Sequence, residues 1–202
     1  MTRSLRDRSL YLCTPIRDDL VRFVAACVEG GVDVVQLRDK VHDARDLLAA
    51  AEQLAALCRT LDVPFVVNDR CDLALAAGAN GVHVGQDDLP VAWCREVLGP
   101  EAIVGLSTHA DAELARALTE PVSYLSAGPV VATPTKPGRP GTGTEYAARA
   151  TAASPVPVFV TGGVSEATIP SLARAGVRHF VVVRALTEAD DPRAAASRLR
   201  SA

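Results

Sequence analysis

The sequence is short of lysine, of paired cysteines and of long apolar runs. Of its 21 basic residues only Lys40 and Lys136 are lysine, and the other nineteen are arginine. The five cysteines are widely spaced and include no Cys-x-x-Cys pair, so neither a disulfide framework nor a zinc site is indicated. No apolar run approaches the roughly 18 residues of a membrane-spanning helix. These absences argue against a disulfide-stapled, zinc-bound or membrane-spanning protein.

Chain length and net charge further limit the class of protein. The 202 residues, 49% of them hydrophobic, can bury one sizeable core, so we expect a single domain covering residues 1–202. A net charge of −3 provides no attractive field for nucleic acid or an anionic membrane, and we expect neither as a partner. The first fifteen residues are basic but lack the apolar core of a signal peptide, which predicts a soluble, cytoplasmic protein. The sequence leaves open whether copies associate into a homo-oligomer.

Eight apolar runs alternate with helical patterns along the chain. The expected strands cover residues 9–14, 32–37, 65–67, 82–84, 102–106, 122–127, 156–161 and 179–183. The expected helices cover residues 18–29, 43–61, 73–77, 89–97, 111–118, 144–153, 165–175 and 192–200. Such alternation predicts a parallel α/β sheet, and eight units favour closure into a (β/α)₈ TIM barrel over a doubly wound open sheet.

Two neighbouring strands of this pattern end in carboxylates. Asp69 follows the run at 65–67, and Asp88 follows the run at 82–84, with a short helix between the two runs. A strand–helix–strand crossover makes the strands parallel, so both ends emerge on the same side of the sheet. A carboxylate pair beside Asn68 and Gln86 offers only hard oxygen ligands. Any metal here is expected to be Mg²⁺, shared with a substrate phosphate.

In a barrel the carboxyl ends of all strands line a single rim, where such enzymes place their sites. Cations, carboxylates, hydroxyls and glycine turns gather there, which predicts a pocket for a polyanion. The segment from 128 to 143 contains four Pro and four Gly and is expected to be a long loop. The Gly162–Gly163 turn stands where barrels commonly hold a phosphate on backbone N–H groups.

The lysines and histidines of the rim suggest alternative catalytic roles, as a Schiff-base lysine or a histidine base. A Schiff-base lysine needs an apolar or cation-crowded pocket, whereas Lys40 follows Asp39 and Lys136 lies in the Pro/Gly loop. Both suit phosphate binding better. His83 lies inside a strand and is expected to be a hydrogen-bonded core or rim histidine rather than a base, whereas the role of His109 is left open.

The motifs YLCT, VQLRDK, VVNDRCDLALAAGANGVHVGQDDLP, GLSTHA, GPVVATPTKPG, TGGV and VVVRAL occur in this order along the chain. In their residues and spacing they resemble the thiamine phosphate synthase family over nearly the whole chain. The resemblance implies a (β/α)₈ barrel that joins hydroxymethylpyrimidine pyrophosphate to hydroxyethylthiazole phosphate with Mg²⁺, giving thiamine phosphate and pyrophosphate.

The resemblance also assigns residues. Pyrimidine pyrophosphate contacts fall at Gln36, Arg38, Lys40, Asn68, Ser107 and Lys136, of which Arg38, Lys40, Ser107 and Lys136 are the expected catalytic set. Mg²⁺ ligands fall at Asp69 and Asp88. Thiazole phosphate contacts fall at Thr133, Pro134, Thr135, Gly162, Gly163, Val183 and Arg184. The family is thought to react by dissociation: pyrophosphate leaves, the pyrimidine stabilises a methylene cation, and the thiazole nitrogen captures it.

Three positions depart from the family pattern, namely Pro15, Thr161 and Arg184. Arg184 stands where Ser is frequent, so it either adds a phosphate contact or points away from that site.

Two other functions compete with synthesis of thiamine phosphate. A thiazole tautomerase of the same superfamily would use a histidine as acid and base and would not need the pyrophosphate-binding set. A non-catalytic phosphate-ligand sensor would leave the carboxylate pair unexplained.

Overall fold

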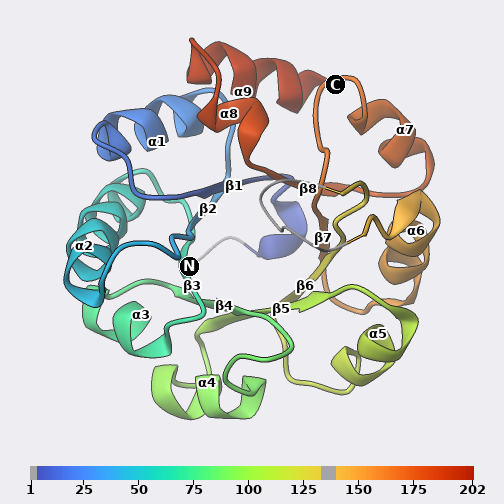
Figure 1. The fold of residues 1–202 in the computed structure, drawn as a ribbon, viewed down its shortest axis with the longest axis horizontal. Helices are drawn as coiled ribbons and strands as arrows, with labels where there is room; N and C mark the ends of the chain where they lie inside the picture. Colours follow the sequence, from blue (N-terminus) through green and yellow to red (C-terminus); the bar gives the residue numbers. More distant parts are fainter. Residues whose placement is uncertain (1–3, 133–139) are drawn as a thin grey trace.

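Eight parallel strands close into a barrel, and helices surround it on the outside (Figure 1). The computed structural model describes residues 4–132 and 140–202. Each strand pairs with its neighbours in chain order, and β1 pairs with β8 to complete the closure. The strands are β1 (Leu10–Thr14), β2 (Val34–Leu37), β3 (Phe65–Asn68), β4 (Gly81–Val84), β5 (Ile103–Thr108), β6 (Tyr124–Ala127), β7 (Val158–Val160) and β8 (His179–Val182). The predicted fold class is confirmed.

The helices follow the strands in turn. They are α1 (Leu20–Glu29), α2 (Ala44–Thr60), α3 (Cys71–Ala77), α4 (Val91–Leu98), α5 (Asp111–Ala117), α6 (Gly143–Ala153), α7 (Ile169–Arg174), α8 (Arg184–Thr187) and α9 (Pro192–Ser201). A 3₁₀ turn, η1 (Leu5–Asp7), precedes β1, and Leu5 packs against the apolar cluster inside the barrel. Within the described residues no helix is both long and apolar enough to cross a membrane.

Local sequence accounts for these helices. The Asp43 side chain accepts hydrogen bonds from the backbone N–H groups of Arg45 and Asp46, which caps the start of α2. Gly78 ends α3 in the left-handed conformation, with φ of 66°. Apolar residues at helical spacing, such as Leu54 in α2, are buried against the strands.

Two apolar clusters occupy the two faces of the barrel wall. The larger one fills the layer between strands and helices and is mostly aliphatic. The smaller one lies inside the barrel and consists of Tyr11, Val34, Val66, Tyr124 and Phe159. Two residues further along β2, β3 and β5, the inward positions are polar, at Gln36, Asn68 and Ser107. This change from apolar to polar side chains places the site at the carboxyl ends of the strands.

Some predicted boundaries were wrong. The strand expected at 102–106 continues to Thr108 because Ser107 and Thr108 still pair with β6. The strands expected at 122–127 and 156–161 are shorter than predicted, and the one expected at 179–183 ends at Val182. There Val183 instead precedes the short helix α8, which, like η1, was not predicted. Part of the predicted 128–143 loop lies outside the described residues.

Candidate active site

A cavity of about 840 Å³ opens at the carboxyl ends of the strands. All the predicted site residues that the structure describes line it, namely Gln36, Arg38, Lys40, Asn68, Asp69, Asp88, Ser107, Gly162, Gly163, Val183 and Arg184. Thr133, Pro134, Thr135 and Lys136 lie outside the described residues. The barrel therefore brings together side chains that are up to 148 positions apart in sequence, from position 36 to position 184.

The charged wall of this cavity consists of Arg38, Lys40, Asp69 and Asp88. The loop that carries both cations is fixed by Asp39, which lies between them. Its carboxylate accepts hydrogen bonds from the backbone N–H groups of Ile16 (3.1 Å), Val41 (2.8 Å) and His42 (3.0 Å). Burial opposes ionisation, but the bonds from His42, Val41 and Ile16 outweigh it and lower the pKa of Asp39 to about 2. Asp39 thus holds the loop while its two neighbours line the cavity.

Asp69 lies in a strained position at the end of β3. Its φ is 62°, a left-handed conformation that is uncommon outside glycine, and its N–H donates to the His83 carbonyl at 2.8 Å. The Lys40 ammonium lies 3.0 Å from the Asp69 carboxylate. Asp88 adjoins the same carboxylate and accepts a 2.7 Å bond from the Gly85 N–H. The structure thus brings the two predicted metal ligands together.

Burial and two charged neighbours act on the Asp69 carboxyl group. Burial raises the pKa of Asp69, and Asp88 raises it further, whereas Lys40 lowers it. Among the described residues no group of three or more His, Cys, Asp or Glu side chains could hold a metal. Two adjacent carboxylates nevertheless suit Mg²⁺, which keeps several waters and takes further oxygens from substrate phosphates.

The glycine wall lies opposite in the strand order and consists of Gly162, Gly163, Val183 and Arg184. Both glycines have positive φ, 90° and 75°. A Cβ at Gly162 would lie 2.4 Å from Pro129 Cβ, and one at Gly163 would lie 2.3 Å from Val131 Cγ2. Glycine is therefore required twice over, by backbone conformation and by the close packing of the segment 129–131.

Val183 and Arg184 form the rest of the glycine wall. Val183 precedes α8, and its carbonyl accepts the N–H groups of Leu186 and Thr187 at 3.0 and 2.9 Å. The first N–H groups of a helix have no partner inside the helix, so they face whatever lies before it. Arg184 lines the cavity, which favours the first of its two predicted orientations.

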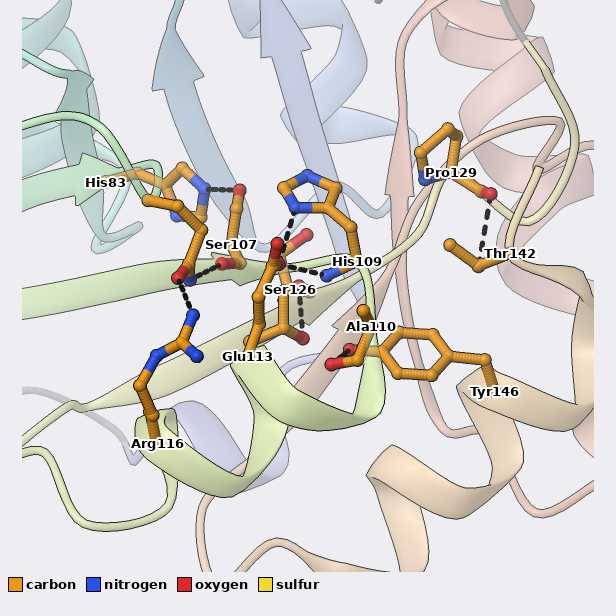
Figure 2. Close-up of polar contacts among 12 residues, drawn as sticks. His83, Ser107, His109, Ala110, Glu113, Arg116, Ser126, Pro129, Thr142 and Tyr146 are labelled. Carbon is orange, nitrogen blue, oxygen red and sulfur yellow. Dashed lines mark hydrogen bonds and ion pairs between the residues drawn. The ribbon is translucent and has the colours of Figure 1, made fainter. Parts of the chain in front are cut away.

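Two histidines also line the cavity. His83 is buried, and both of its ring nitrogens are hydrogen-bonded, Nδ1 to Tyr124 and Nε2 to Ser107, which agrees with its prediction as a core histidine. Figure 2 shows the bond to Ser107. His109 lies 2.9 Å from Glu113 through Nδ1, and its backbone N–H donates to the same carboxylate at 2.7 Å (Figure 2). Glu113 therefore ties His109 to the first turn of α5.

Sequence reasoning missed Tyr11, Cys13, Tyr124 and Ser126, which also line the cavity. They lie inside β1 and β6 rather than after them. The available signal was the two-residue period of a strand, which puts Tyr11 and Cys13 on one face, and Tyr124 and Ser126 on one face. A polar-tipped side chain in an apolar run that faces a barrel interior is a candidate for the floor of the site.

A closed parallel barrel with a charged cavity at the carboxyl ends of its strands defines a (β/α)₈-barrel enzyme. A family model described as thiamine monophosphate synthase matches residues 10–186. Thiamine-phosphate synthases from Mycobacterium sp. (strain KMS) and Thermobifida fusca are each 48% identical to the chain. The alignments cover 98% and 99% of this chain and 94% of each relative.

A solved structure titled thiamine phosphate pyrophosphorylase, from Pyrococcus furiosus, superposes with a TM-score of 0.86. It is 31% identical, over 96% of this chain and 94% of that one. The chain belongs to the thiamine monophosphate synthase family, and it is a transferase of thiamine biosynthesis.

Proposed function

We propose that the protein joins hydroxymethylpyrimidine pyrophosphate to hydroxyethylthiazole phosphate, releasing pyrophosphate and forming thiamine phosphate. One observation carries the proposal: a single cavity has two walls whose residues suit phosphate in two different ways. The charged wall offers cations and a carboxylate pair, and the glycine wall offers backbone N–H groups and one arginine. A reaction between two phosphate-bearing substrates needs both.

The charged wall would bind the pyrophosphate. Arg38 can contact two phosphate oxygens through its planar guanidinium, and Lys40 provides a compact charge beside them. Asp69 and Asp88 would hold Mg²⁺, with the remaining coordination positions filled by pyrophosphate oxygens and water. When bound, the ion would neutralise negative charge that develops on the leaving pyrophosphate.

The glycine wall would bind the thiazole phosphate at Gly162, Gly163 and the start of α8. In the dissociative reaction the C–O bond to pyrophosphate breaks first, and its electron pair leaves with pyrophosphate. The aminopyrimidine stabilises the resulting methylene cation, and the thiazole nitrogen then supplies the electron pair of the new C–N bond. The protein's part is positioning and charge stabilisation, so it needs no side-chain nucleophile.

The test is release of pyrophosphate by the purified protein given both substrates and Mg²⁺, with each component omitted in turn. We expect release coupled to thiamine phosphate formation and dependent on all three. Release without thiamine phosphate, or without need for the thiazole substrate, would contradict the proposal. Exchange between thiazole phosphate tautomers in the absence of any condensation would instead establish the tautomerase alternative.

A further inference from the structure

Five polar side chains form a hydrogen-bonded chain across the barrel interior, where they line the cavity; we call it the floor chain. It runs from Gln36 through Tyr11, Tyr124 and His83 to Ser107. The successive distances are 3.0 Å (Gln36 Nε2 to Tyr11 Oη), 2.8 Å (Tyr11 Oη to Tyr124 Oη), 2.9 Å (Tyr124 Oη to His83 Nδ1) and 2.8 Å (His83 Nε2 to Ser107 Oγ). Only its two ends are predicted substrate contacts. The three middle residues have no assigned role.

The Gln36 amide determines which group donates and which accepts in each hydrogen bond of the floor chain. Its Oε1 accepts from the Cys13 thiol at 3.0 Å, and its Nε2 donates to the Tyr11 oxygen. The buried Tyr11 O–H needs an acceptor, and among the described residues the Tyr124 oxygen provides it. The Tyr124 O–H is then left to donate to His83 Nδ1.

The order of donors and acceptors continues through His83 to Ser107. A neutral histidine that accepts at Nδ1 carries its proton on Nε2, so His83 donates to Ser107 Oγ. The Ser107 oxygen thereby accepts from the protein, and its own proton is available to a ligand in the cavity. Burial raises the pKa of Tyr11 and the pKa of Tyr124 well above the usual range, so both phenols keep the protons that this order requires.

The strand register builds the middle of the floor chain. His83 pairs with Gly105 across β4 and β5, and Gly105 pairs with Tyr124 across β5 and β6. A Cβ at Gly105 would lie 2.1 Å from the Tyr124 ring, so a side chain there would exclude the tyrosine. The His83 and Tyr124 rings stack over Gly105, with their centroids 5.5 Å apart and an interplanar angle of 23°. The barrel thus leaves room for this pair of rings.

We propose that Tyr124 and His83 are positioning residues that present the Ser107 hydroxyl as a hydrogen-bond donor to the pyrimidine substrate. This inference rests on the proposed function for the identity of the ligand. It requires an acceptor on that ligand, a ring nitrogen or a phosphate oxygen, opposite Ser107. Neither Tyr124 nor His83 transfers a proton in the reaction; they fix which way one hydroxyl points.

The first experiment is ¹H–¹⁵N correlation NMR of the ligand-free protein labelled in its histidine rings. A His83→Gln variant identifies the signals of His83 among the four histidines. We expect the Nε2–H tautomer for His83 at neutral pH. An Nδ1–H tautomer in the wild-type protein would mean that the floor chain runs in the opposite direction, and would overturn the inference.

The second experiment compares Tyr124→Phe with Tyr146→Phe. Tyr146 is also buried, but its hydroxyl donates to the Ala110 carbonyl at 3.3 Å, away from the floor chain (Figure 2). In Tyr124→Phe we expect mixed His83 tautomers and about tenfold weaker binding of pyrimidine pyrophosphate, as for the loss of one oriented hydrogen bond. Tyr146→Phe should change neither. Unchanged tautomer and affinity in Tyr124→Phe would overturn the inference.

Both readouts are made without turnover. Expected results in both experiments, together with no thiamine phosphate formation, would contradict the proposed function and leave the floor chain's role in binding supported. In an active protein, Tyr124→Phe should raise the KM for pyrimidine pyrophosphate and leave the KM for thiazole phosphate unchanged. An equal rise in both values would indicate a merely structural effect and contradict the positioning role.

Discussion

The two walls of the cavity differ in whether side chains or backbone form them. The charged wall depends on side chains, with Lys40 3.0 Å from Asp69 and Asp88 against the same carboxylate. The glycine wall depends mainly on backbone, with Gly162 and Gly163 at positive φ and packed against the segment 129–131. The difference suits the two proposed ligands, because a leaving pyrophosphate gains charge during the reaction whereas the thiazole phosphate only has to be held. Substitutions of the carboxylates on the charged wall should therefore affect catalysis, whereas substitutions of the glycines should affect folding, and those of the arginine on either wall should affect binding.

The largest effect is expected from Asp69→Asn. Loss of one of the two proposed carboxylate ligands should lower kcat at least about 100-fold at ordinary Mg²⁺ concentrations, measured as pyrophosphate release. The free energy of unfolding without metal should be unchanged or higher. Repulsion from Asp88 disappears, Asn tolerates a φ of 62°, and the half-exposed pair with Lys40 contributes little. Full activity in a folded variant would remove the metal assignment.

Gly162→Ala tests the glycine wall. Positive φ and the 2.4 Å approach to Pro129 should together lower the free energy of unfolding by about 2 kcal/mol, measured by urea denaturation. Gly176→Ala is the matched control, because Gly176 has a φ of 94° and nothing within 4 Å of its would-be Cβ. Equal losses in the two variants would show that packing against the segment 129–131 contributes nothing.

The two walls can be compared directly with one arginine each. Arg38→Ala should raise the KM for pyrimidine pyrophosphate about tenfold, and Arg184→Ala should do the same for thiazole phosphate, since each removes a proposed charge-assisted hydrogen bond to phosphate. Each variant should leave the KM for the other substrate within about twofold. If Arg184→Ala changes neither value, the backbone alone holds the thiazole phosphate.

The smallest effect concerns the loop of the charged wall. Asp39 has a pKa of about 2 in the folded protein, against about 3.9 for an unfolded chain. Its lowered pKa stabilises the fold fully above about pH 4, and that contribution is lost as the pH falls towards 2. Between pH 5 and pH 3 the wild type should therefore lose about 1 kcal/mol more unfolding free energy than Asp39→Asn. Parallel losses would show that Asp39 does not fix the loop.

The sequence predicts much of the fold and of the cavity rim. Alternating strands and helices indicate the barrel, and polar residues after apolar runs indicate the rim, because parallel strands bring all their carboxyl ends together. Ser107 shows the limit: it was expected after a strand and instead lies within β5. Strand ends depend on pairing with neighbours, which local sequence does not contain.

The floor of the cavity was harder to predict. Tyr11 and Tyr124 are 113 positions apart, and either one alone resembles an ordinary core aromatic. Their hydroxyls acquire partners only when the barrel closes and brings β1, β4 and β6 around a common interior. The short helix α8 was missed for a related reason, since four residues are too few for a helical period to be recognised.

Gly105 has a consequence for how this barrel could change over time or be redesigned. Its missing side chain and the Tyr124 ring occupy one volume, with only 2.1 Å between a would-be Cβ and the ring. Position 105 cannot be enlarged by itself: a larger residue there requires a smaller one at 124, and a smaller residue at 124 alone leaves the floor underpacked. The two positions should therefore covary among relatives. A library that randomises them independently would consist largely of chains that cannot close the barrel floor.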